Sequence, residues 1–337
     1  MRKLILAAPA AIAFFAIVPV LAQQAAPSSS VETIRSQAAP IPDSAITGFV
    51  KTFTAPSELS GKIPRWFTGI CLKTQGLPRE LSEAVSKRIL EIAQQVGAPV
   101  GKQPCNLNSV VIFDADPQGV MDDIAANHQE LLGPHDIAQT KDLAKIRFPI
   151  QAWYATETQD DKGINVVDSK EQSALCGSVD TTTMVGAPGD LKNGGLRFDP
   201  ARFSQANLDL QRYCGHEFDT GNRLRNGKHS HIVAVTVVAN MDTMRFHELS
   251  AVADYLALVI LSQTKAFERC EKMETIANLL VPACDLDNRI KGLMPGDVAF
   301  LKALYRADTG GNLVAQQSSI TGEMKKLLAA EQTVPAR

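Results

Sequence analysis

The chain has 337 residues, of which 45% are hydrophobic and 21% charged, and it carries a formal net charge of −2. This composition is typical of a globular protein with enough apolar residues for a substantial core. No run of basic residues is interleaved with aromatic ones, so the sequence argues against a nucleic-acid partner.

The first 22 residues have the pattern of a secretory signal peptide. Arg2 and Lys3 form a basic start, residues 4–22 are apolar, and the small Ala22 precedes Gln23. The pattern predicts export with cleavage after Ala22, and an uncleaved membrane anchor is the alternative. Cleavage removes two positive charges and leaves a net charge of about −4. No later segment is long and apolar enough to cross a membrane, so we expect a periplasmic or secreted protein with no integral membrane segment after cleavage.

Six cysteines in an exported chain predict disulfide bonds, because that compartment is oxidising. Pairing of cysteines that are neighbours in the sequence is favoured, because it closes the shortest loops and suits their positions relative to the predicted elements. The expected bonds are Cys71–Cys105, Cys176–Cys214 and Cys270–Cys284. The apolar core is large enough without them, so we expect them to reinforce the fold.

The residues that follow the signal peptide predict a linker and then alternating strands and helices. Residues 23–45 are rich in Ala, Gln, Ser and Pro, which is typical of a flexible linker. Residues 46–54 fit either a short helix or a strand. The elements expected next are a strand at 67–72, a helix at 78–96 that ends at Gly97, a strand at 107–113, a helix capped by Asp116, and an edge strand at 147–156.

Residues 157–230 are polar and glycine-rich with little periodicity, which predicts a long irregular insert. After it, residues 232–239 are almost all apolar and mostly β-branched, as in a strand covered on both faces. A short turn leads into a long helix that is apolar nearly all round. Further helices are expected at 270–280, 296–307 and 320–331. Residues 46–337 are therefore predicted to form one α+β domain, with a mixed sheet, a buried central helix and a C-terminal helical cluster.

Two groups of polar residues are candidates for a metal site. His229 and His231 lie on one face if they belong to a strand, which suits two zinc ligands, and His216 or Glu217 is a possible third. A solvated histidine pair is the alternative reading. His247 and Glu248 match the start of the zinc-protease helix motif, in which the glutamate acts as the base. Ala251 stands where that motif has its second histidine.

Asp254 is a single carboxylate in the middle of the apolar helix. A buried carboxylate has to be hydrogen-bonded, paired or protonated, so we expect a structural role with a cationic partner. Arg223 and Arg225, just ahead of the central strand, are the first candidates for that partner.

Several segments resemble a family of exported bacterial proteins, among them IPRWFTGICLKTQGLP, ADYLALVILSQ and GDVAFLKALYRAD. This likeness covers about residues 64–324 and implies export and a common fold, without an activity. The order of elements is also similar to the layout of zincin metalloproteases of the matrixin type. In those enzymes a closing helix carries a motif matched here by Asp297, Leu301, Leu304 and Tyr305. The second resemblance implies a zincin-like fold whose zinc motif is broken at Ala251 and Ala257.

Two functions remain open at this point. The first is a non-catalytic binding or structural protein of the cell envelope, without a cofactor and with an unidentified partner. The alternative is a metal-dependent hydrolase, a degenerate zincin-like peptidase that holds zinc with His216, His229, His231 or His247 and uses Glu248 as its base.

Overall fold

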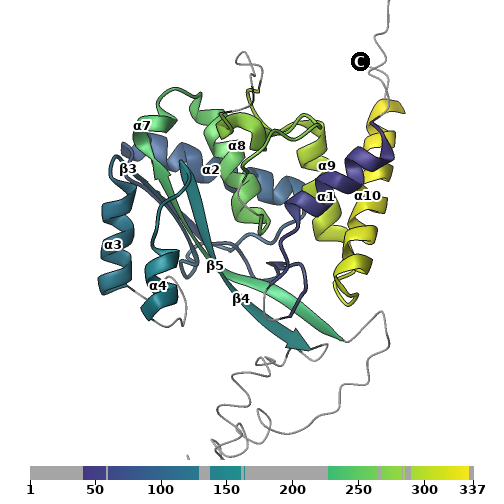
Figure 1. The fold of residues 1–337 in the computed structure, drawn as a ribbon, viewed down its shortest axis with the longest axis horizontal. Helices are drawn as coiled ribbons and strands as arrows, with labels where there is room; N and C mark the ends of the chain where they lie inside the picture. Colours follow the sequence, from purple (N-terminus) through teal and green to yellow (C-terminus); the bar gives the residue numbers. More distant parts are fainter. Residues whose placement is uncertain are drawn as a thin grey trace, which may run out of the picture. The chain divides into compact units, whose positions relative to one another are not determined.

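The computed structural model describes residues 41–57, 60–128, 137–160, 163, 227–264, 267–282, 284 and 290–333. From Ile41 onward they belong to one compact unit, in which helices pack on a mixed sheet (Figure 1). The predicted α+β class is therefore confirmed. The signal peptide and most of the linker lie outside the described residues and stay predictions.

The sheet is organised around its longest strand, β5. Its strands are β1 (Arg65–Trp66), β2 (Leu72–Gln75), β3 (Ser109–Asp114), β4 (Ile150–Asp160) and β5 (Lys228–Asn240). β4 pairs antiparallel with β5 along residues 228–239 and so occupies one edge of it. β1 and β3 share the other edge, where they pair in parallel with residues 231–232 and 235–240. β2 pairs in parallel with β3 and with no other described strand, so β2 is an outer strand of the described sheet.

Helices cover both faces of the sheet (Figure 1). They are α1 (Asp43–Phe53), α2 (Arg79–Val96), α3 (Pro117–Asn127), α4 (Ile137–Leu143), α7 (Met241–Met244), α8 (Leu249–Leu261), the 3-10 helix η2 (Ile276–Leu280), α9 (Pro295–Arg306) and α10 (Leu313–Thr333). On one face α2 and α8 pack together, with α9, α10 and α1 behind them. On the other face α3 packs on β3 and β5.

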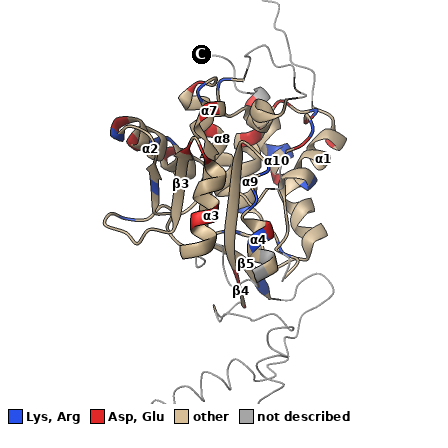
Figure 2. Cartoon of the chain, turned by 60° about the vertical axis from the view of Figure 1, so that its left-hand side comes forward, with Lys and Arg blue, Asp and Glu red and all other residues tan. Residues whose placement is uncertain are grey.

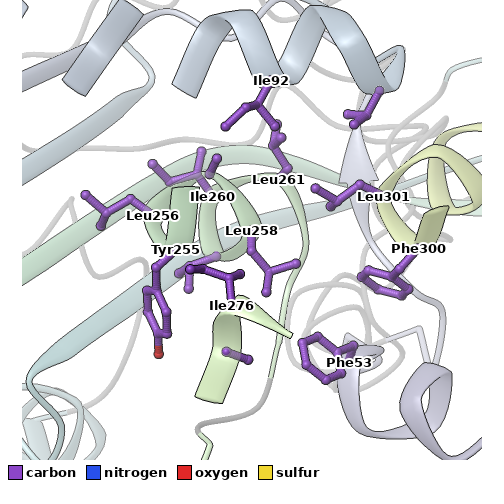
Figure 3. Close-up of a cluster of buried hydrophobic side chains, with 14 of the residues drawn as sticks. Phe53, Ile92, Tyr255, Leu256, Leu258, Ile260, Leu261, Ile276, Phe300 and Leu301 are labelled. Carbon is purple, nitrogen blue, oxygen red and sulfur yellow. The ribbon is translucent and has the colours of Figure 1, made fainter. Parts of the chain in front are cut away.

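The larger core lies between the sheet and α8. All residues of α8 from Ala251 to Leu261 are buried, which confirms the prediction of a buried central helix. Its side chains meet Ile92 of α2, Ile276 of η2 and the aromatic rings of Phe53 and Phe300 (Figure 3). At about 25 cal/mol for each Å² of apolar surface removed from water, such a helix is held mainly by this burial.

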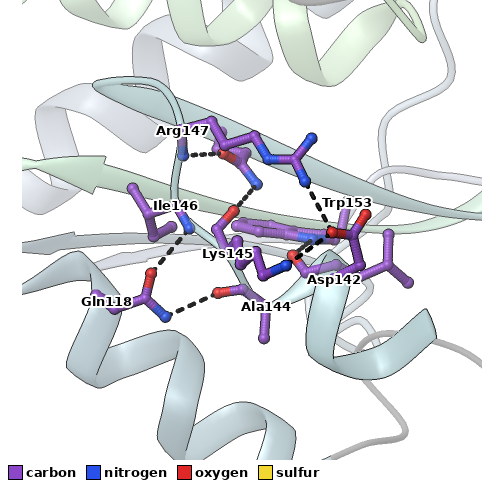
Figure 4. Close-up of polar contacts among 9 residues, drawn as sticks. Gln118, Asp142, Ala144, Lys145, Ile146, Arg147 and Trp153 are labelled. Atoms are coloured by element: carbon purple, nitrogen blue, oxygen red, sulfur yellow. Dashed lines mark hydrogen bonds and ion pairs between the residues drawn. The ribbon is translucent and has the colours of Figure 1, made fainter. Parts of the chain in front are cut away.

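The smaller core lies under α3 and α4 and is closed by polar contacts at the start of β4 (Figure 4). The Gln118 side chain donates to the Ala144 carbonyl at 3.0 Å and accepts from the Ile146 amide at 2.9 Å. The Trp153 indole donates to the Leu143 carbonyl at 2.8 Å. These bonds hold the connection between α4 and β4 against the sheet.

The N-terminal boundary differs from the sequence prediction. Residues 46–54 fitted a helix or a strand, and residues 46–53 belong to α1 with Thr54 as its C-cap. The buried residues Ile46, Phe49, Val50 and Phe53 follow helical spacing. Because this helix starts at Asp43, the last three residues of the predicted linker are ordered. The apolar stripe packs against α10 and the core, and that burial selects the helix.

Three further element boundaries were predicted wrongly. The strand expected at 67–72 is wrong, because β1 ends at Trp66 and β2 begins only at Leu72. Between them the chain passes from a position beside β5 to a position beside β3. The helix expected at 270–280 is helical only at η2. At the predicted insert, residues 157–160 continue β4 and residues 228–230 begin β5, because these ends pair with each other. Almost all of the segment between them lies outside the described residues.

Candidate functional site

The histidines proposed as metal ligands do not form one described site. His229 and His231 lie near the start of β5, whereas His247 follows its end. At about 3.3 Å per residue, the nine residues from His231 to the end of β5 span about 30 Å. His216 and Glu217 lie outside the described residues. Among the described ones, no three His, Cys, Asp or Glu side chains are grouped so that they could hold a metal ion.

His229 and His231 are each held by a neighbouring side chain. His229 Nδ1 lies 2.6 Å from the Thr309 hydroxyl. The His231 ring stacks on Phe67, with 3.9 Å between ring centroids, and the Arg65 guanidinium lies 4.8 Å from the Phe67 centroid. The pKa of His231 is lowered, first by burial and then by the charges of His229 and Arg65. The imidazole of His231 therefore favours its neutral form.

The cations beside this pair stabilise the end of α9. Arg65 donates from one nitrogen to the carbonyls of Leu304 and Ala307, at 2.7 and 2.9 Å. Lys62, which is buried, donates to the carbonyls of Gly310 and Gly311 at 3.0 and 2.6 Å. The carbonyls of Leu304 and Ala307 at the C-terminus of α9 lack helical partners and carry partial negative charge, so the basic Arg65 is favoured there. Lys62 instead satisfies two carbonyls of the connection between α9 and α10. Both cations therefore have a structural use.

His247 and Glu248, which match the start of the zinc-protease helix motif, precede α8 and do not belong to it. Glu248 takes the N-cap position with extended backbone angles and makes no side-chain cap bond. Its carboxylate lies 3.9 Å from the Lys291 ammonium, and both side chains are mostly exposed. Burial lowers the pKa of His247. The exposed Glu248–Lys291 pair, at this distance, contributes little to stability. Phe246 also precedes α8, and its side chain is 75% exposed.

Asp254 is buried, as predicted, and its partner is Arg88 of α2. The guanidinium donates to both carboxylate oxygens, at 2.6 and 2.9 Å. The amide of Leu293 donates to Oδ2 at 2.8 Å. No local signal in the sequence points to Arg88, because the two residues are 166 positions apart. The partners it suggested, Arg223 and Arg225, lie outside the described residues.

A second buried carboxylate, Asp297, lies in the first turn of α9. It accepts from the Thr275 hydroxyl at 2.5 Å, from the Ile276 amide at 2.8 Å and from the Met294 amide at 2.9 Å. Burial raises the pKa of Asp297 to about 6, against the effect of these three donors. In the sequence this residue stood out only through the resemblance to zincins, which implied no hydrogen-bond partner for it. An acidic residue in the first turn of a helix that starts with proline is the local signal for a cap.

Two of the three predicted disulfides are present among the described residues. Cys71–Cys105 and Cys270–Cys284 have Cα separations of 6.0 and 5.4 Å, within the usual range. The first ties the start of β2 to the segment that leads into β3. Cys176 and Cys214 lie outside the described residues.

Thiol titration tests the complete set of disulfides. We expect no reactive thiol when the purified protein is unfolded without a reducing agent, because all six cysteines are predicted to pair. The control is the same protein after reduction, in which every cysteine should react. Two reactive thiols before reduction would contradict the predicted Cys176–Cys214 bond, and the two described bonds would stand.

A groove with a volume of about 800 Å³ lies between β2 and α2. One wall is β2 with the turn that follows it, and the other is the exposed side of α2. Residues that line it include Leu72, Lys73, Thr74, Ser86, Leu90 and Gln94. The sequence predicted α2 but neither the position of β2 nor the groove, because the groove exists only where β2 lies at the edge of the sheet.

The turn after β2 sets one end of the groove and requires glycine. Gly76 has a φ of 92°, and a Cβ atom there would lie 1.8 Å from the Phe113 carbonyl oxygen. No other residue fits that space or readily takes that backbone angle. The close approach places Leu77 and the start of α2 beside the groove.

A smaller pocket of about 270 Å³ lies beside β4. Its polar residues already bond to one another. Arg147 donates to Asp142 at 2.8 Å, and Gln151 donates to the Lys145 carbonyl at 2.9 Å. The groove beside β2 therefore offers the larger surface for a ligand.

A search of protein-family models, curated proteins and solved structures finds no match to this chain. The resemblances to exported bacterial proteins and to zincins therefore stay predictions. Among the described residues, no helix combines the length and the apolar character needed to cross a membrane.

Proposed function

We propose that the protein is an exported, non-catalytic binding protein of the cell envelope, and that it binds its partner in the groove between β2 and α2. The groove, about 800 Å³ along an outer strand of the described sheet, is the observation that carries the proposal. Concave surfaces of this size are the usual places for ligands. The two described disulfides and the signal-peptide pattern support export.

The arrangement of the candidate catalytic residues favours binding over hydrolysis. His247 and Glu248 lie at the opposite end of β5 from His229 and His231, so these four residues do not share a centre. The acidic residues in the groove are paired with cations of the same helix, Glu83 with Arg79 at 2.8 Å and Glu91 with Lys87 at 3.8 Å. These exposed carboxylates are already paired with a cation, whereas a general base has to be placed against the proton that it takes from a substrate.

A matched pair of tryptophan variants tests whether the groove binds. Gln94 and Gln95 are adjacent exposed residues of α2, but only Gln94 lines the groove. The probe is a phage-displayed library of random short peptides selected on the purified protein. We expect Gln94→Trp to abolish capture of the selected peptides, because the indole occupies the groove, and Gln95→Trp to leave it unchanged. Equal capture by both variants would contradict the proposal.

The alternative hydrolase is tested with the zinc-loaded protein and a set of unstructured peptide substrates. We expect no hydrolysis that depends on Glu248, because this exposed side chain pairs only loosely with Lys291. The comparison is between the wild type and Glu248→Gln, which keeps the shape and removes the base. Cleavage by the wild type that is lost in Glu248→Gln would establish the hydrolase instead.

A further inference from the structure

We propose that the groove takes an extended, acidic peptide segment of a partner protein, which adds to the sheet as a new strand beside β2. This inference rests on the proposed function and names the chemistry of the partner. Strand addition to an open sheet edge is a general mode of peptide recognition, in which the main chain supplies affinity and alternate side chains supply specificity.

The backbone of β2 points hydrogen-bonding groups into the open edge. The Cys71 carbonyl accepts from the Ser109 amide at 3.1 Å. In a parallel pair, every second residue directs its amide and carbonyl to the neighbouring strand. Cys71, Lys73 and Gln75 therefore face β3, and Leu72 and Thr74 direct their amides and carbonyls away from it. In the described part of the chain, no strand pairs with that edge.

An extended main chain is the ligand that satisfies these groups. The amides and carbonyls of Leu72 and Thr74 are separated by two residues of strand, about 6.6 Å, which is the repeat of another extended chain. A helix or a compact small molecule does not present alternating donors and acceptors at this spacing. The bare edge of a short strand therefore selects for an extended peptide.

The walls of the groove suit side chains that alternate in character. Leu72 and Leu90 line it and are partly buried against the main core, so they form an apolar surface. The Ser86 hydroxyl donates to the buried Thr74 hydroxyl at 2.8 Å, which links α2 to β2 along the groove. A strand laid beside β2 directs every second side chain towards α2 and this apolar surface.

The charged residues that line the groove indicate the sign of the charge on the partner. On α2 the Arg79–Glu83 pair and the Lys87–Glu91 pair each join one positive and one negative side chain, so neither adds net charge. Figure 2 shows charges of both signs along this helix. Lys73 of β2 also lines the groove, is exposed, and forms no ion pair with any described residue. Its unbalanced positive charge favours a peptide with Asp or Glu beside it.

The test extends the peptide selection on the wild-type protein. We expect the selected peptides to be enriched in Asp and Glu and in β-branched residues, and to bind Lys73→Glu at least about tenfold more weakly. The matched control is Lys102→Glu. Lys102 is also exposed and without an ion pair to a described residue, and it does not line the groove. N-methylation of alternate peptide amides should weaken binding by at least about tenfold in one register and little in the other.

The outcomes separate this inference from the proposed function. One outcome is that binding of the selected peptides is blocked by Gln94→Trp but is insensitive both to Lys73→Glu and to N-methylation. This outcome would support the groove as a binding site and overturn strand addition. Enrichment of basic peptides would overturn the acidic partner. Failure to select any peptide that Gln94→Trp blocks would overturn the proposed function together with the inference.

Discussion

Replacing Asp254 with alanine is expected to lower the free energy of unfolding by about 3 kcal/mol, measured by chemical denaturation. The carboxylate side chain is 3% exposed and accepts three hydrogen bonds, two from Arg88 and one from the Leu293 amide. The variant leaves the amide without this acceptor and opens a cavity between α8 and the segment ahead of α9. Arg88 is 45% exposed and can turn towards water, so the loss falls at the lower end of the range for buried pairs.

Two variants of arginine in α2 serve as a matched comparison. Arg88→Ala removes the cation and leaves a buried carboxylate without a counter-charge, so we expect a loss as large as that of Asp254→Ala. Arg79→Ala breaks an exposed pair with Glu83 and should change stability by no more than about 1 kcal/mol. Unchanged stability in Asp254→Ala would show that the carboxylate has no structural role, and the helix face that it occupies would become a candidate site.

Asp297 is expected to make stability fall as the pH rises from about 4 to about 7. Burial raises the pKa of Asp297 from 3.8 to about 6, so the folded state holds the proton more tightly than the unfolded state. Stability from this group is fully present below its unfolded pKa and is lost as the pH rises through the folded pKa. A shift of this size corresponds to about 3 kcal/mol. Denaturation curves at pH 4, 6 and 8 measure it.

Asp297→Asn isolates this effect, because the amide has nearly the same shape but does not titrate. Its oxygen can accept from the amides of Ile276 and Met294, and its nitrogen can donate to the Thr275 hydroxyl. Between pH 4 and 8 the wild type should lose about 3 kcal/mol relative to this variant. Parallel curves for the two proteins would show that the carboxylate is not protonated in the folded state at pH 4 to 6.

The two aspartates together position the start of α9. Asp254 accepts from the amide of Leu293 and Asp297 accepts from the amide of Met294, which are adjacent in the chain. Asp254 also ties this point to α2 through Arg88, and Asp297 ties it to η2. Negative groups at a helix N-terminus also interact favourably with the helix dipole. This junction therefore links four helices behind the sheet.

The amino-acid sequence by itself determined the elements whose signals are local. The helix from Arg79 to Val96 starts after Pro78 and ends at Gly97, as its spacing and end residues predicted. Asp116 caps α3 by accepting from the Gly119 amide, and the apolar run before Asn240 forms the central strand. Periodicity and caps act within one or two turns of chain, so they can be read without knowledge of the fold.

Only the tertiary structure decided which distant residues meet. Asp254 has Arg88 as its partner because α8 and α2 pack side by side, and no local pattern encodes that choice. His231 stacks on Phe67 because β1 pairs in parallel with β5. The groove exists because β2 is an outer strand of the described sheet and α2 lies beside its open edge. These features depend on strand order and helix packing, which are set by burial over the whole chain rather than by neighbouring residues.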